Sequence, residues 1–389
     1  MMTGKMDKSD KPLPVQGKNR LLSLDALRGF DMLWIAGGGT LLTVLAKLSG
    51  AAWLATLAKQ MNHVPWEGFH FWDLIFPLFM FISGIAIPLS VKSALSKNES
   101  KKNLFLRVLK RMIILVLLGI LYNGVFRDGF GNARYASVLG QIGIAYFFAS
   151  VIFIFSKSFK TNLYWLAGIL LGVSILQLFV PVPGIGAGVF TPEGCINGYI
   201  DRLYLPGRLA YGTEGMLSSG NGIYDALGLL SIVSAIGITI MGIIAGNILQ
   251  NSTFTEYRKT GLLAGIGLVL ILLGLVISPF YPIIKVCWTT TYNLLAGGIS
   301  FLLIALFYLV IDVWRFHKWS FFFRVIGMNS IFIYLLGRIV PVETITGYFI
   351  GWIIKPAGNL GELIGVIGFL TGEWLLLYFM YRKNIFIKV

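Results

Sequence analysis

Charged residues are scarce in this sequence. Asp, Glu, Lys and Arg together make up 13% of its 389 residues, whereas a soluble globular domain carries about 25%. Hydrophobic residues make up 56%, and the mean hydropathy is +0.79. This composition excludes an ordinary soluble domain. It predicts an integral membrane protein, embedded in a lipid bilayer and long enough for roughly ten spans of about 20 residues each.

Cysteine and histidine are also rare, with two and three residues respectively. Cys195 and Cys287 are too few for a disulfide framework or a Cys-rich metal site, and a single bridge or two free thiols both remain open. The chain contains no HExxH motif, no GxSxG elbow and no paired-Cys ligand set. The sequence therefore gives no support to metal or serine-hydrolase chemistry, and we expect no metal.

Acidic residues are outnumbered by basic ones, 17 against 32, which gives a net charge of +15. Most Lys and Arg residues lie beside apolar runs, and no separate basic domain exists. The tendency of Lys and Arg to remain on the cytoplasmic side of a membrane explains this excess. Nucleic acid is therefore not an expected partner.

The apolar runs predict an all-α, polytopic membrane helix bundle in a single domain, 20–389. A polar tail, 1–19, precedes it and is expected to be disordered and cytoplasmic, without a cleaved signal peptide. The segment 342–358 is short and interrupted by glycine, so we expect it to be interfacial or re-entrant. Ten spans are predicted, at about 24–46, 71–93, 104–124, 136–156, 162–180, 225–249, 260–279, 289–312, 321–340 and 361–381.

The loops between these runs alternate in charge. Basic loops fall on one face, and the loops of the opposite face hold few Lys or Arg residues. Ten spans fit this alternation only if both termini are cytoplasmic. The long loop 181–224, rich in Gly and Pro, is then on the outer face, and connections of that length are often functional.

Ionisable side chains at the ends of apolar runs are the candidates for chemistry, because they are costly there. His63 lies in a short polar segment, and its imidazole can take a proton near neutral pH, although a single interfacial histidine is more often structural. Asp73, ten residues further on, is expected to orient His63 or an arginine, or to cap a helix. Asp25 and Arg28 are three residues apart on one helical face, which suits either an ion pair or a substrate contact.

A run of three glycines, 37–39, interrupts the first span. It lacks the strand-to-helix context and the lysine of a phosphate-binding loop. We therefore expect close helix packing or local unwinding at this point.

Eight segments, in this order, resemble the heparan-α-glucosaminide N-acetyltransferase family of transmembrane acyltransferases. No single segment is a strong signature, but the ordered set is specific. The segments are SLDALRGFDM (23–32), HVPWEG (63–68) with WDLIFPLFMFISG (72–84), RYASVLGQIGIAYF (134–147), GYIDRLYLPG (198–207), MGIIAGNIL (241–249), PIIKVCWTTTYNLL (282–295), GMNSIFIYL (327–335) and YRKNIFIKV (381–389).

The resemblance implies an enzyme that takes acetyl-CoA from the cytoplasmic side and acetylates the amine of a terminal glucosamine on the other side. A bacterial inner (cytoplasmic) membrane suits a chain of this type. The residues implied to be catalytic are His63, Asp73 and Arg134, with Arg134 or Lys285 stabilising the oxyanion. Those expected to bind the amino-sugar acceptor are Asp25, Arg28, Asn62, Trp66, Asp201, Lys285, Trp288, Asn329 and Ser330.

A basic cluster near the cytoplasmic face is expected to receive the CoA phosphates, although such residues are also ordinary topology signals. It consists of Arg107, Lys110, Arg111 and Arg324. Ile35 and Ala36 stand where animal members of the family carry an asparagine, so Asn62 is a candidate for that role. The large extracytoplasmic domain of the animal members has no counterpart in this sequence, so a free amino sugar or a short oligosaccharide is the expected acceptor.

Two other functions fit the same residues. A proton-coupled sugar or amino-sugar transporter would use Asp25, Arg28 and Asp73, and an O-acyltransferase would modify a hydroxyl of a glycan or lipid. The oligomeric state, including a homodimer, is left open.

Overall fold

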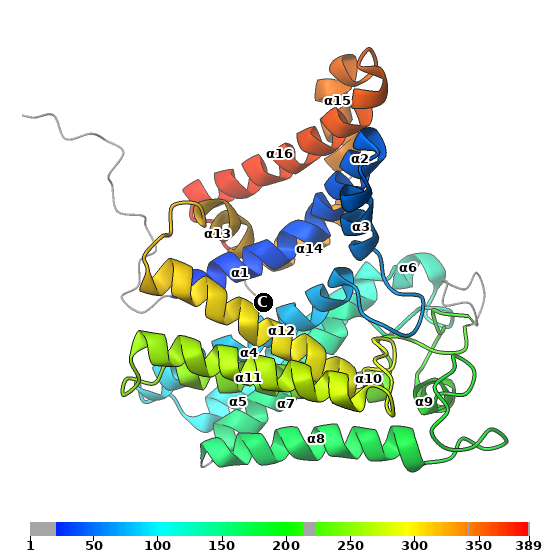
Figure 1. The fold of residues 1–389 in the computed structure, drawn as a ribbon, viewed down its shortest axis with the longest axis vertical. Helices are drawn as coiled ribbons and strands as arrows, with labels where there is room; N and C mark the ends of the chain where they lie inside the picture. Colours follow the sequence, from blue (N-terminus) through cyan, green and yellow to red (C-terminus); the bar gives the residue numbers. More distant parts are fainter. Residues whose placement is uncertain (1–20, 157, 213–221, 341, 388–389) are drawn as a thin grey trace, which may run out of the picture.

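Every regular element that the computed structural model describes is a helix (Figure 1). It describes residues 21–156, 158–212, 222–340 and 342–387, so the predicted tail 1–19 lies outside it. The all-α fold is confirmed. The helices are α1 Leu22–Leu33, η2 Trp34–Gly38, α2 Gly39–Ser49, α3 Ala52–Gln60, α4 Phe71–Leu95, α5 Lys101–Tyr122, α6 Val125–Asp128, α7 Val138–Phe155, α8 Phe159–Phe179, α9 Ile196–Tyr204, α10 Leu229–Leu249, α11 Glu256–Ile277, α12 Thr290–Tyr308, η3 Leu309–Val313, α13 Phe321–Gly327, α14 Ser330–Ile339, α15 Val342–Ile354, η4 Gly358–Leu360 and α16 Gly361–Arg382.

Eight helical segments of the described chain are long and apolar enough to cross a membrane, which confirms a polytopic membrane protein. They are Leu22–Ser49, Phe71–Leu95, Val138–Phe155, Phe159–Phe179, Leu229–Leu249, Glu256–Ile277, Thr290–Val313 and Gly358–Arg382. The 22-residue helix α5 packs along α7. It is as long as these, but three basic residues lie within its apolar stretch.

The predicted span 321–340 is not one helix. It divides into α13 and α14 at Met328 and Asn329. The Asn329 side chain donates to the carbonyl of Ile385 (3.1 Å) and accepts from the N–H of Ile387 (2.9 Å). The break therefore ties the C-terminal tail to the bundle, and sequence hydropathy alone does not reveal such a break.

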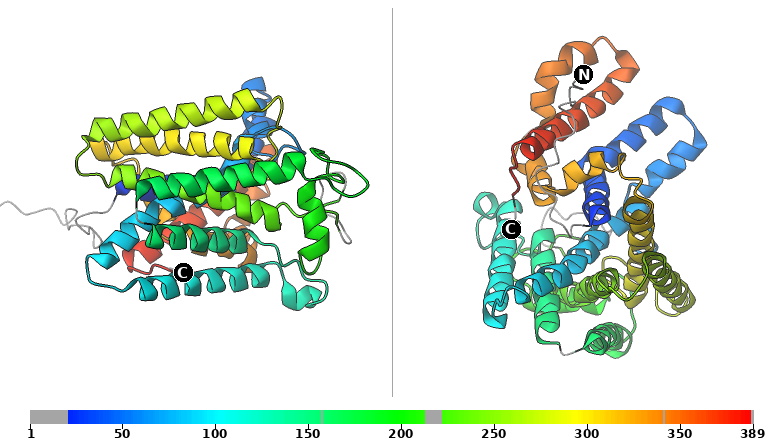
Figure 2. Two further views of the ribbon diagram at one scale, coloured as in Figure 1. Left: turned by 90° about the horizontal axis from the view of Figure 1, so that it is seen from below. Right: turned by 90° about the vertical axis from the view of Figure 1, so that its left-hand side faces the viewer.

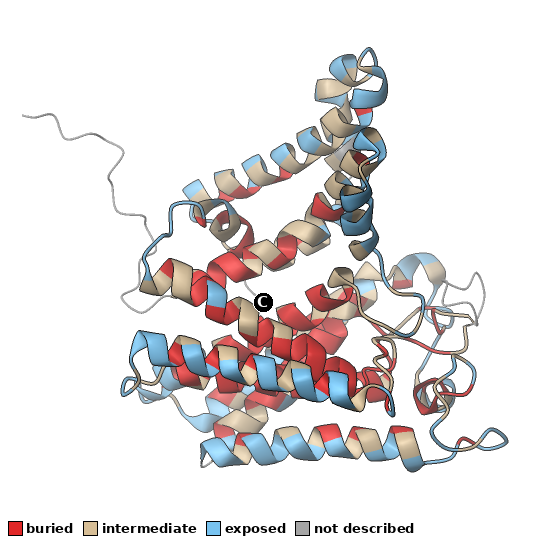
Figure 3. Cartoon of the chain, in the orientation of Figure 1, coloured by how far each residue is buried: buried red, intermediate tan, exposed pale blue. Residues whose placement is uncertain are grey.

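The centre of the bundle is formed by α10, α4 and α12, whereas α8, α11 and α16 lie at its edge (Figure 3). In the most apolar window of α10, 83% of residues are buried, against 17% for α11. A helix that is hydrophobic all round is buried in protein or in lipid. The exposed apolar side chains of the outer helices, such as Val276 and Leu272, are therefore suited to contact lipid.

Helix α1 is anchored at its start by a carboxylate from a distant segment. Asp312 of η3 accepts the backbone N–H groups of Leu22 (3.3 Å) and Ser23 (3.1 Å), which lack partners within the helix. Further along, Gly29 packs against the backbone of α13, where an added Cβ would lie 1.7 Å from the Phe323 carbonyl oxygen. This close contact explains why α1 and α13 lie side by side.

The first span unwinds locally, as the triple glycine suggested. Gly37 has a φ of 123°, inside the π-helical turn η2, and α2 continues the span beyond it.

The segment predicted as interfacial or re-entrant contains α15, which packs on α16. Figures 1 and 2 show this pair standing apart from the main bundle, next to α2. The prediction that this segment is interfacial or re-entrant stays a prediction.

The helices define two membrane faces. We call the face at which α4 ends and α5 and α8 begin the basic face, because the Lys- and Arg-rich loops gather there; it lies to the left in Figure 1. The long connection 181–224 lies at the opposite face and contains α9, and residues 213–221 of it fall outside the described ranges.

Candidate functional site

His63 and Asp73 form a dyad at the opposite face. The segment between them folds back on the start of α4, where the carbonyl of Asn62 contacts His70 Nδ1 (2.8 Å) and Gly68 N–H donates to the Ile283 carbonyl (2.9 Å). This fold brings His63 Nδ1 to 2.7 Å from Asp73 Oδ1. Asp73 is fully buried, while the His63 side chain is 56% exposed.

Asp73 is held from three further directions. Its Oδ2 accepts the backbone N–H of His70 (3.0 Å), and its backbone carbonyl accepts the hydroxyl of Tyr292 (2.8 Å). Lys285 Nζ lies 3.2 Å from Asp73 Oδ1. A buried carboxylate with this many partners is a rigid acceptor, and it can fix the orientation of the imidazole.

Lys285 also constrains the tautomer of His63. Its Nζ lies 2.9 Å from His63 Nδ1, as well as near Asp73. If His63 Nδ1 donates a proton to Asp73, it cannot also accept one from the Lys285 ammonium group. In the consistent arrangement, His63 Nδ1–H and Lys285 therefore both donate to Asp73. His63 Nε2 is then left with a lone pair and can act as a base. Burial lowers the pKa of Lys285, although Asp73 opposes the change.

These side chains open on a cavity of about 260 Å³, which we call the histidine cavity. Its wall combines polar and charged groups with an apolar lining from α4, α7 and α14. Such a combination is typical of small-molecule sites. The polar and charged lining residues are His63, Arg134, Tyr211, Lys285, Ser330 and Tyr334.

Arg134 reaches the histidine cavity as half of a bidentate ion pair. Its Nε and Nη2 donate to the two carboxylate oxygens of Asp225 at 2.8 and 2.7 Å. Burial works against the charge, but Asp225 outweighs it and raises the pKa of Arg134. Tyr211 lies beside the guanidinium, 5.6 Å from it, and stacks on Tyr224.

A second cavity, of about 240 Å³, lies between the histidine cavity and the basic face. We call it the arginine cavity, because Arg28 and Arg111 line it. Arg28 lies 3.6 Å from Asp25 on the same helix face, as their spacing predicted. Arg111 packs over the ring of Tyr146 at 4.1 Å. Ile387, in the tail beyond α16, closes one side.

The two cavities are adjacent, because Phe79, Ser330 and Ile331 line both. Together they follow α4 from Asp73 to Ala86, roughly 20 Å at 1.5 Å per residue. That length exceeds half the thickness of a bilayer's apolar core, about 15 Å. A long, thin molecule could therefore extend from the arginines to the histidine.

Several predicted substrate residues lie elsewhere. Trp66 donates to the Phe190 carbonyl (2.6 Å), and Trp288 is fully buried between Phe76 and Tyr292. The Asn62 side chain donates to the Ala58 carbonyl in the last turn of α3. Like Asn329, these residues are not among those that line the histidine cavity.

Asp201 also acts at a distance from the cavity. It is 1% exposed and accepts the N–H groups of Leu229 (2.9 Å) and Asp225 (3.3 Å). It thereby holds the start of α10 and the loop that carries the partner of Arg134. Burial raises the pKa of Asp201 to about 7.

The predicted CoA cluster is divided in the structure. Arg111 lines the arginine cavity, whereas Arg107 is exposed and pairs with Glu99. Lys110 is exposed on α5, and Arg324 lies 5.8 Å from the ring of Phe321. Of the four, only Arg111 joins Arg28 at the cavity.

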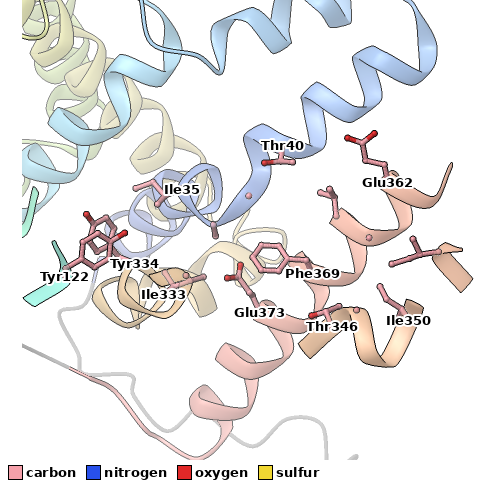
Figure 4. Close-up of a pocket in the computed structure, with 17 residues that line it drawn as sticks. Ile35, Thr40, Tyr122, Ile333, Tyr334, Thr346, Ile350, Glu362, Phe369 and Glu373 are labelled. Atoms are coloured by element: carbon pink, nitrogen blue, oxygen red, sulfur yellow. The ribbon is translucent and has the colours of Figure 1, made fainter. Parts of the chain in front are cut away.

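A third cavity, of about 560 Å³, lies beside the histidine cavity, and Ile35 and Tyr334 line both. Figure 4 shows it between the first span and the α15–α16 pair, with Glu362 and Glu373 in its wall. The broken turn at Gly37 faces it.

Asp225 and Tyr211 are site residues that sequence reasoning missed. Asp225 is 91 residues from Arg134 in the chain, and no spacing rule links them. The only available signal was its place at the start of an apolar run, where an acidic residue is costly.

Cys195 and Cys287, whose state was open, are free buried thiols packed in one cluster with Ile284.

The fold and this geometry define a polytopic helical membrane protein with a histidine–aspartate dyad whose carboxylate is buried. The profile of the family described as "Domain of unknown function (DUF5009)" matches residues 20–239, more than half of the chain. The chain belongs to this family.

The chain is also 28% identical to two curated proteins, each named "Heparan-alpha-glucosaminide N-acetyltransferase". One is from Homo sapiens, aligned over 419 residues, and one from Mus musculus, aligned over 420. The alignments cover 95% of this chain and 60% and 61% of the relatives. The resemblance inferred from the motifs is thus confirmed, and the chain spans about 60% of the length of these relatives.

Proposed function

We propose that this protein is a transmembrane N-acetyltransferase. It moves the acetyl group of acetyl-CoA, bound from the basic face, to the amine of glucosamine or a glucosamine-terminated oligosaccharide at the opposite face. The observation that carries the proposal is the pair of adjacent cavities, with a histidine–aspartate dyad at one end and two arginines at the other. The names of the relatives agree with this chemistry.

The reaction requires a neutral amine to attack the thioester carbonyl. As the C–N bond forms, His63 Nε2 takes the proton of the amine, and Asp73 stabilises the imidazolium through Nδ1–H. The tetrahedral intermediate then expels the CoA thiolate. His63 returns the proton to the sulfur, which yields the amide and free CoA, with all atoms accounted for. One histidine suffices for this direct transfer.

The arginine cavity suits the opposite end of acetyl-CoA. Arg28 and Arg111 offer charged donors to phosphate oxygens, which arginine binds well. The apolar wall shared by the two cavities, including Phe79 and Ile331, suits the pantetheine arm. Arg134 and Lys285 line the histidine cavity where negative charge develops on the carbonyl oxygen, and a low dielectric would strengthen that interaction.

Purified protein given acetyl-CoA and a panel of acceptors tests the activity. We expect release of free thiol only with amino sugars, together with a product heavier by one acetyl group. Release with hydroxyl acceptors alone would favour an O-acyltransferase. Uptake of sugar into vesicles without any acetylated product would favour a transporter, and either result would contradict the proposal.

A further inference from the structure

A separate cavity of about 570 Å³ opens on the basic face, and the proposed reaction does not use it. It lies between the end of α4, the start of α5, the α7–α8 turn and the end of α10. We call it the basic-face cavity. It shares no lining residue with the histidine or arginine cavities.

Two lysines from different helices line this cavity. Lys92 is in the last turn of α4, and Lys101 is the first residue of α5. Among the described residues, no carboxylate lies within 4 Å of either ammonium group. Lys92 instead donates to the side-chain oxygen of Asn247 (3.0 Å). The cavity therefore carries positive charge that the described part of the protein does not neutralise.

Hydrogen-bond donors line the same cavity as the two lysines. Helix α8, 21 residues long, begins at the cavity, where Ser158 accepts from Thr161 N–H and Phe159 lines the wall. The first N–H groups of a helix and its dipole favour an anion. Asn247 and Asn162 both accept through Oδ1, from Lys92 and from Ser156 respectively. The remaining polar group of each side chain is its amide NH2, which is a hydrogen-bond donor.

The rim of the cavity is apolar. Phe153, Phe159 and Phe254 line it together with Leu95. These residues lie at the ends of membrane-spanning helices, where a lipid's phosphate and the start of its acyl chains are found. Basic pockets between helices at such a face bind anionic lipid head groups.

We propose that the basic-face cavity binds the phosphate of an anionic phospholipid, with Lys92, Lys101 and the N-terminus of α8 around the phosphate and the phenylalanines beside the acyl chains. The bound lipid would join the end of α4 to the α7–α8 turn. Because α4 also carries Asp73 at its other end, such a lipid would steady the helix that holds the dyad.

Native mass spectrometry of the full-length protein, titrated with phosphatidylglycerol or phosphatidylcholine, tests the proposal. The variant K92A/K101A removes both charges, and K97A/K102A is the matched control, because its two lysines are exposed near the same helix ends but do not line the cavity. At about 1 kcal/mol for each lysine near a charged surface, K92A/K101A should bind phosphatidylglycerol roughly thirty-fold more weakly. The control should bind it as the wild type does.

A second arm separates lipid from free phosphate. Phosphatidylglycerol should raise the melting temperature of the wild type and of K97A/K102A much more than that of K92A/K101A, because a ligand that binds more weakly stabilises less at the same concentration. Inorganic phosphate should raise it much less. Equal lipid binding by the two double variants, or equal stabilisation by inorganic phosphate, would overturn the proposal.

Discussion

The histidine and arginine cavities share a wall but differ in how their positive charges are matched. In the histidine cavity, Arg134 lies 2.7 Å from a carboxylate oxygen of Asp225, and Lys285 lies 3.2 Å from Asp73. In the arginine cavity, Arg28 is 3.6 Å from Asp25, and Arg111 lies over an aromatic ring. Within the described ranges, no carboxylate lies within 4 Å of Arg111.

This difference separates two tasks. Charges that are already paired hold side chains in place and leave the cavity nearly neutral, which suits a proton transfer between uncharged groups. Arg111, which lies over an aromatic ring, can neutralise a phosphate brought by a ligand. One end of the path is therefore arranged for chemistry and the other for anchoring the ligand.

His63→Ala should have the largest effect. Removing a general base lowers turnover by about 10²–10⁴-fold, while the arginine cavity should still bind acetyl-CoA. Initial rates of acetyl transfer and a separate binding measurement check this. His317→Ala is the control, because that histidine bonds to the Arg315 carbonyl in an exposed loop. Turnover above about a tenth of the wild-type value would exclude His63 as the base.

Asp73→Asn should reduce the turnover number by about a hundredfold, since the amide cannot stabilise the imidazolium. The KM for acetyl-CoA should change little, because the arginine end is intact. Combining this change with His63→Ala should cost hardly more than His63→Ala alone, because residues that act as a unit are not additive. Fully multiplicative losses would show that Asp73 acts independently of His63.

Arg111→Gln should raise the KM for acetyl-CoA about tenfold or more, the effect of losing one charged hydrogen bond to phosphate. The KM for the amino sugar should stay the same. Arg107→Gln is a matched control on the same helix, because Arg107 pairs with Glu99 outside the cavity. If both variants raise the KM for acetyl-CoA equally, the arginine cavity has no special part in binding.

Asp201→Asn should have the smallest effect, on stability alone. The folded-state pKa of Asp201 is about 7, against an ordinary value of 3.8. Between these values the folded protein keeps a proton that the unfolded chain loses, so the stability contributed by this group falls as pH rises from about 4 to about 7. Melting temperatures at pH 5 and pH 8 should therefore differ less in the variant. A raised KM for the acceptor would instead indicate a binding role for Asp201.

Much of the fold was predictable, because a continuous apolar run of about 20 residues crosses a membrane as a helix. The run 71–93 corresponds to α4, Phe71–Leu95. The prediction that 321–340 forms one helix was wrong, because the Asn329 side chain bonds to the tail 56 residues away. Hydropathy averages over a window, and it cannot register a single side chain that interrupts a helix.

Contacts within the candidate site were predictable from spacing only where the residues are close in the chain, and Arg134, Lys285 and Ser330 were named through the family resemblance alone. His63 and Asp73 are ten residues apart, and their contact follows from the fold of one short loop. Asp225, by contrast, meets Arg134 only through the packing of several helices. Likewise, nothing in the sequence distinguished Arg111 from Arg107, because the two lie on the same face of α5, one turn apart, and only the position of the arginine cavity along this helix decides which of them lines it.

Acetyl transfer in sealed, oriented vesicles tests the central claim most directly. The orientation is first fixed by labelling an exposed cysteine at Ala187 or Lys383, on loop 181–224 and after α16 respectively. Radiolabelled acetyl-CoA supplied only to the basic face, with glucosamine only on the opposite face, should yield acetylated sugar on the side of the glucosamine. Acetyl-CoA supplied only to the His63 side should yield none. Product formed under that second condition would contradict transfer across the membrane and leave a one-sided acyltransferase.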